Sequence, residues 1–145
     1  MRKLIVILLV LTTILLLIGC TSGKTIEASL DEEFTLAIGQ TASISSENLK
    51  IKFLDVPADS RCPSDVQCVW AGEVTCSFEI TSDESTEQVE MTLPGLTDVS
   101  AGQTVGNYRY KFTVEPYPES TKEIEKEAYR VKMRISIKLP ALPTP

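Results

Sequence analysis

The segment 59–73 holds most of the residues in this chain that could do chemistry. Two carboxylates can share general acid and base work in hydrolysis, provided that they converge in a cleft and one has a raised pKa. An arginine can form two parallel hydrogen bonds with a carboxylate or a phosphate. The segment is therefore a candidate for hydrolysis by Asp59 and Glu73, for recognition, or for a structural corner. Its candidate binding residues are Asp59, Arg61, Pro63, Asp65 and Glu73.

The chain contains no histidine. Histidine is the usual general base near neutral pH and the commonest metal ligand, so the familiar Ser/His and Cys/His pairs are excluded. The acidic clusters 31–33 and 83–84 lack the ligand spacing of a calcium loop. We therefore expect a protein that is not an enzyme and that carries no metal and no cofactor.

The cysteines are Cys20, Cys62, Cys68 and Cys76. Regular alternation over 70–80 predicts that Cys68 and Cys76 lie on one strand, about 26 Å apart at 3.3 Å per residue. A disulfide needs Cα atoms within roughly 7 Å, so this pair is excluded. Cys62 and Cys68 can instead close a small loop, which leaves Cys76 as a buried, unreactive thiol.

The segment 59–73 also resembles a motif, D-S-R-C-P followed by C-x-W-A-G, of small secreted or lipid-anchored prokaryotic proteins of unknown function. This resemblance implies a similar fold and location but transfers no activity. Each residue has a structural interpretation as well: Pro63 bends the chain, Asp59 accepts hydrogen bonds from nearby amides, and Arg61 pairs with a carboxylate. The segment is either a bridged corner between two sheets or a rigid recognition loop.

The N-terminus has the pattern of a secretory signal peptide over residues 1–19, with Arg2 and Lys3 ahead of an apolar run from Leu4 to Ile18. A helix of fifteen residues spans only about 22 Å, short of the roughly 30 Å hydrocarbon core, so an uncleaved membrane helix is the weaker alternative. Residues 17–20, Leu-Ile-Gly-Cys, resemble the lipobox of prokaryotic lipoproteins. That resemblance implies lipidation of Cys20 and anchoring to the cell membrane or outer membrane, with the domain on the extracytoplasmic side.

The chain that follows this signal is acidic and of single-domain size. Removing residues 1–19 takes away two of the 14 basic residues and none of the 20 acidic ones, which leaves 126 residues with a net charge of −8. An acidic chain gains little from a phosphate backbone, so nucleic-acid binding is disfavoured. We expect a lipidated tether over 20–29, a β-domain over 30–140 and a disordered proline-rich tail over 141–145.

The apolar residues of the domain follow a period of two, which predicts half-buried antiparallel strands. About seven strands are expected, each with one face toward the core and one toward solvent. Such strands favour a β-sandwich, Ig-like or similar, with a small closed barrel as the alternative. A short helix of one or two turns is possible at 120–123. The core is expected to contain Trp70, Phe78, Phe112, Val131, Met133 and Ile135.

A basic stripe marks the outward face of the last two predicted strands. It could meet anionic headgroups or surface polymers, although such residues more often pair with glutamates on a neighbouring strand or protect an edge. The stripe consists of Arg130, Lys132, Arg134 and Lys138, beside Arg109 and Lys111.

These patterns predict a lipid-anchored, non-catalytic binding or structural module at the cell envelope. Its partners would be the membrane, reached through Cys20, and an envelope or extracellular protein. The alternative is an inhibitor of an extracellular protease that presents the Cys62–Cys68 loop to the protease cleft.

Overall fold

A computed structural model describes residues 23–83, 85–95 and 102–138. Cys20, the signal peptide and the tail over 141–145 lie outside the described residues, so those predictions stand as they are. Within the described part no helix is long and apolar enough to cross a bilayer.

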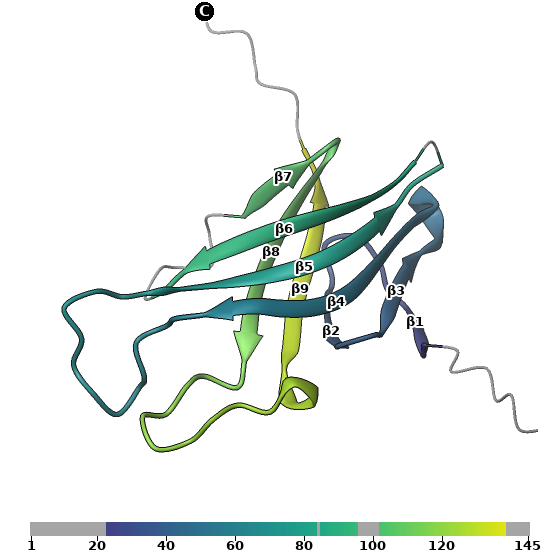
Figure 1. Cartoon of the computed structure of the whole chain (residues 1–145). Coiled ribbons are helices and arrows are strands. Elements are labelled where there is room, and N and C mark those ends of the chain that lie inside the picture. The colour runs from purple at the N-terminus through teal and green to yellow at the C-terminus, as the bar shows by residue number, and fades with distance from the viewer. Residues whose placement is uncertain (1–22, 84, 96–101, 139–145) are drawn as a thin grey trace, which may run out of the picture.

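The described chain folds into two β-sheets that pack face to face (Figure 1). One sheet has the order β1-β3-β4-β5-β6 and the other β2-β9-β8-β7, and every pairing is antiparallel except that of β1 with β3. The all-β sandwich is thus confirmed, and no barrel closes. The strands are β1 (Thr25–Glu27), β2 (Glu33–Ala37), β3 (Thr41–Ile44), β4 (Leu49–Asp59), β5 (Glu73–Thr81), β6 (Thr86–Pro94), β7 (Gln103–Val105), β8 (Tyr108–Glu115) and β9 (Arg130–Ile137).

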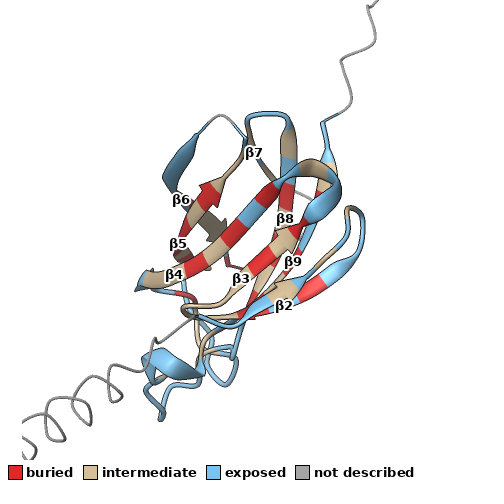
Figure 2. Ribbon diagram, turned by 90° about the vertical axis from the view of Figure 1, so that its right-hand side faces the viewer, coloured by how far each residue is buried: buried red, intermediate tan, exposed pale blue. Residues whose placement is uncertain are grey.

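The core lies between the sheets, because alternate residues of each long strand point inward. Figure 2 shows this alternation of buried and exposed positions along the ribbons. Phe78 stacks on Phe53 of the same sheet at 5.5 Å between ring centroids and meets Phe112 of the other sheet edge-on at 5.7 Å. Of the predicted core, Phe78, Phe112, Val131, Met133 and Ile135 are buried, and Trp70 is not.

Several element boundaries differ from the sequence-based expectation. The residues Thr25–Glu27, expected within the tether, form β1 against β3, and β7 was not anticipated because three residues are too few to show a period. No α-helix forms at 120–123, and the loop instead carries a single 3-10 turn at Lys126–Ala128. Ile137 continues the inward alternation of Val131, Met133 and Ile135 in sequence, yet it is 52% exposed at the end of β9.

Replacing Phe78 with alanine should lower the free energy of unfolding by about 3 to 5 kcal/mol, because a buried ring that joins the two sheets leaves a cavity. The same substitution at the exposed Thr35 on β2 should change it by less than about 0.5 kcal/mol. Urea unfolding measures both values. Equal losses at the two positions would contradict the assignment of faces.

Candidate binding site at the disulfide-bridged loop

The loop Ser60–Gly72, called here the bridged loop, connects β4 to β5 at the lower left of Figure 1. Its base is closed by backbone hydrogen bonds from the Ser60 amide to the Glu73 carbonyl (2.8 Å) and from the Cys62 amide to the Ala71 carbonyl (3.0 Å). Gly72 has a φ of 68°, and a Cβ atom there would stand 1.8 Å from the Ser60 carbonyl oxygen. Only glycine therefore fits at the point where the loop meets β5.

The bridge joins Cys62 and Cys68, as predicted, with 5.9 Å between their Cα atoms. The reason given for the pairing was partly wrong, since β5 begins only at Glu73 and Cys68 lies in the loop rather than on a strand. Cys76 is a free, buried thiol, also as predicted. Its burial raises the pKa of the thiol to about 12, so it is not nucleophilic near neutral pH.

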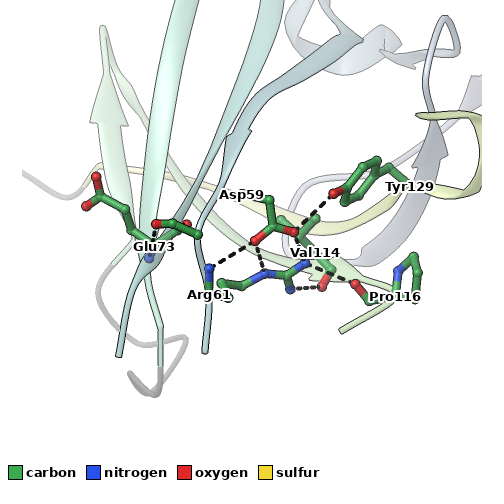
Figure 3. Close-up of polar contacts among 7 residues, drawn as sticks. Asp59, Arg61, Glu73, Val114, Pro116 and Tyr129 are labelled. Atoms are coloured by element: carbon green, nitrogen blue, oxygen red, sulfur yellow. Dashed lines mark hydrogen bonds and ion pairs between the residues drawn. The ribbon is translucent and has the colours of Figure 1, made fainter. Parts of the chain in front are cut away.

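Arg61 lies beneath the bridged loop and is only 5% exposed. Its guanidinium forms a bidentate pair with Asp59, with Nε 2.9 Å from Oδ1 and Nη2 2.6 Å from Oδ2 (Figure 3). It also donates to the backbone carbonyls of Val114 at 2.7 Å and Pro116 at 3.0 Å, and it stacks over the ring of Tyr117 with 4.8 Å from Cζ to the centroid. Arg61 thus ties β4 to the end of β8 and is not presented to a ligand.

Asp59 is the acceptor at the centre of this cluster. Besides both contacts from the guanidinium it accepts a hydrogen bond from the Arg61 amide (3.2 Å) and one from the Tyr129 hydroxyl (3.1 Å). Burial alone would raise the pKa of Asp59, but the hydrogen bonds and charge of Arg61 outweigh it, and the pKa lies below its usual range. Asp59 is therefore an ionised structural partner rather than a general acid.

Other contacts fix the bridged loop to the segment that follows β8. Asp65 accepts hydrogen bonds from both the amide and the hydroxyl of Ser120, and the Ser64 amide donates to the Pro118 carbonyl at 3.0 Å. The Val66 amide donates to the Pro63 carbonyl at 3.3 Å, which closes a tight turn inside the bridge. The loop is held at both flanks although most of its side chains are exposed.

Glu73 and Asp59 do not form a catalytic pair. Glu73 contributes its backbone to the loop base, through the hydrogen bonds with Ser60, while its exposed carboxylate points away from Asp59 in Figure 3. Hydrolysis by two converging carboxylates therefore has no support in this geometry.

Trp70 is where the sequence-based assignment of faces was wrong. We expected it in the core, yet it is 82% exposed, and its neighbour Val69 is 92% exposed. The alternation that includes Val74, Cys76 and Phe78 cannot be continued back to Trp70, because the left-handed Gly72 interrupts the extended chain. The only tryptophan of the protein thus lies on its surface.

A cavity of about 700 Å³ lies between the bridged loop and the ends of β6 and β8, and Trp70 forms part of its wall. Its walls are largely apolar, and the guanidinium of Arg61 is already engaged by Asp59 and two carbonyls. Of the predicted binding residues, Arg61 and Pro63 are in the lining, whereas Asp59, Asp65 and Glu73 are not. The lining residues are Arg61, Cys62, Pro63, Ser64, Val66, Gln67, Cys68, Trp70, Leu93, Pro94, Gly95, Thr113, Val114 and Tyr117.

Three of the residues that matter here were not singled out from the sequence. Tyr117 and Leu93 line the cavity, and Tyr129 completes the Asp59 cluster. The two tyrosines could have been noticed in the sequence, because a tyrosine hydroxyl near the core usually finds a polar partner. The position of Leu93 depends on long-range packing that no local pattern reveals.

Comparison with known proteins returned no matching family model, no similar curated protein and no similar solved structure.

Among the described residues no group of three or more histidine, cysteine, aspartate or glutamate side chains gathers in a way that could hold a metal ion.

Replacing Arg61 with lysine should lower the free energy of unfolding by about 2 to 4 kcal/mol, because the ammonium group cannot make both contacts with Asp59 and also reach the Val114 and Pro116 carbonyls. The same change at the exposed Arg134 should cost less than about 0.5 kcal/mol. Thermal and urea unfolding would check both. A stable Arg61→Lys protein would show that the cluster does not hold the loop.

Proposed function

We propose that this protein is a lipid-anchored, non-catalytic binding module of the cell envelope. In this proposal the cavity beside the bridged loop receives an apolar or aromatic group of an envelope or extracellular protein. Cys20 attaches the chain to the membrane, and the sandwich carries the loop on the extracytoplasmic side.

The observation that supports binding is the exposure of Trp70, in the wall of a largely apolar cavity, and of its chain neighbour Val69. Burying a side chain of this size is worth roughly 2 to 3 kcal/mol, so a contiguous exposed pair beside a cavity is typical of an interaction site. Tryptophan in particular is enriched among residues that dominate binding energy. The bridge and the Arg61 cluster hold the walls in place, which lowers the ordering cost of binding.

The protease-inhibitor alternative has less support. The exposed bridged loop would favour it, but residues 63–66 form a tight turn, and Asp65 is engaged by Ser120. A segment that enters a protease cleft in the manner of a substrate is extended. We therefore favour recognition through the cavity and the Val69–Trp70 edge.

The anchoring part of the proposal predicts that replacing Cys20 with serine will prevent acylation. The variant should then carry no acyl group and be found either with residues 1–19 still attached or released from the membrane, which membrane fractionation and intact mass spectrometry distinguish. Intact mass spectrometry of the wild-type chain should show acyl groups on a mature N-terminus at Cys20. A mature chain that starts elsewhere and carries no acyl group would contradict anchoring without bearing on the cavity.

The binding part predicts that a photo-cross-linking amino acid at Val66 will form a specific adduct on intact cells. Trp70→Ala should abolish this adduct while changing the melting temperature by less than about 2 °C, since Trp70 adds little to the folded core. A cross-linker at Lys50, exposed on the outer face of β4 and away from the cavity, serves as the matched control. An adduct at Val66 that survives Trp70→Ala, or none above the Lys50 control, would contradict a site at the cavity.

A further inference from the structure

The outer face of the sheet β2-β9-β8-β7 carries a concentration of positive charge. Residues that point outward alternate with core residues along β8 and β9, and five of the 14 basic residues of the chain lie on this face. The whole chain nevertheless has a net charge of −6. We call this surface the basic face, and its cations are Arg109, Lys111, Arg130, Lys132 and Arg134.

Two of these cations stand directly opposite each other. Lys111 on β8 is the cross-strand partner of Arg134 on β9, and Lys132 follows Arg134 on the same face of β9. Like charges in such a position destabilise a sheet, because their Cβ atoms are only about 5 Å apart. Among the described residues neither Lys111 nor Arg134 has an ion pair, although Glu33 on β2 is the other cross-strand partner of Arg134. Glu33 offsets part of the repulsion, but the pairing of Lys111 with Arg134 still places two cations side by side.

The acidic residues on the same face neutralise only part of the charge. Glu33 on β2 and Glu115 on β8 each approach Lys132, at 3.9 Å, and Glu115 is also the cross-strand partner of Arg130. Exposed pairs of this length contribute little to stability. With Arg109 left out because it contacts other groups, the four cations Lys111, Arg130, Lys132 and Arg134 face two carboxylates on β2, β8 and β9. The face therefore keeps a net positive charge, whereas the rest of the molecule is negative.

We propose that the basic face lies on the anionic lipid surface of the membrane that carries the anchor. A lipid anchor alone leaves a domain free to tumble on its tether. A cation close to an anionic bilayer gains about 1 kcal/mol, so several on one flat face would orient an otherwise acidic, repelled domain. The inference uses the proposed attachment at the N-terminal end of the chain and is independent of the cavity.

Lysine footprinting on vesicles can test this with the full chain. The chain is reconstituted into vesicles of phosphatidylcholine, with or without phosphatidylglycerol, and acetylated with an impermeant reagent. Lys111 and Lys132 report on the basic face, while Lys50 and Lys52, on the outer face of β4 in the opposite sheet, are internal controls. Attachment is scored separately, by flotation, so that its failure is distinguished from failure of the orientation.

On anionic vesicles the acetylation of Lys111 and Lys132 should fall several-fold relative to that of Lys50 and Lys52, and about 1 M salt should restore it, because the Debye length is then about 3 Å. On neutral vesicles no difference should arise. Neutralising Arg130 and Arg134 with glutamine leaves both reporters in place and should weaken the surface contact roughly 30-fold, whereas Lys50→Gln with Lys52→Gln removes the same charge and should not.

Equal labelling on the two vesicle types, protection of Lys50 and Lys52 instead, or a chain that fails to float with anionic vesicles would overturn the proposal. Protection by soluble polyphosphate with none by vesicles would also overturn it, since the face would then recognise an anionic polymer. If the vesicles give no protection of Lys111 and Lys132 but the cross-link at Val66 still forms on cells, the proposed binding function is unaffected.

Discussion

The buried pair of Arg61 and Asp59 is the interaction on which the arrangement of the candidate site depends. The guanidinium connects the end of β4 with one carbonyl at the end of β8 and one just after it, and so joins the two sheets where no strand pairing can do so. A buried ion pair is costly to desolvate, and it is tolerated only when its remaining donors and acceptors are satisfied. Here the second Asp59 oxygen also accepts the Tyr129 hydroxyl, and the face of the guanidinium rests on Tyr117.

The bridge between Cys62 and Cys68 acts on top of that cluster. A small covalent loop reduces the conformations of the unfolded chain, but it does not by itself fix where the loop lies on the sandwich. The placement comes from contacts with residues outside the loop, where Asp65 accepts from Ser120, the Ser64 amide donates to the Pro118 carbonyl, and the Gly95 amide donates to the Gly72 carbonyl. The cavity exists because these contacts hold the loop beside β6 and β8 instead of letting it collapse onto them.

The period of two predicted the sandwich and most of its core, because Val131, Met133 and Ile135 follow one another without interruption on a regular strand. It failed at Trp70, since the pattern carries no sign that the backbone turns at Gly72. For Arg61 the sequence left two roles open, recognition or pairing with a carboxylate, and the structure shows the pair with Asp59. Its burial could not be predicted, because it depends on carbonyls more than fifty residues away. What local patterning cannot supply is the partner that a polar group finds in the folded chain.

The geometry of β8 explains how one strand can serve two surfaces. Lys111 belongs to the outer basic face, whereas Thr113 and Val114, on the two sides of the strand near its end, both line the cavity. The two surfaces are therefore separated along β8 rather than by its two sides. A change at Lys111 alters the charge of the outer face without entering the cavity, and a change at Trp70 leaves β8 untouched. Sites so separated are expected to act additively on stability and on their own ligands. Under the two proposals, one strand contributes cations toward an anionic membrane surface and, at its end, part of the wall of a binding cavity.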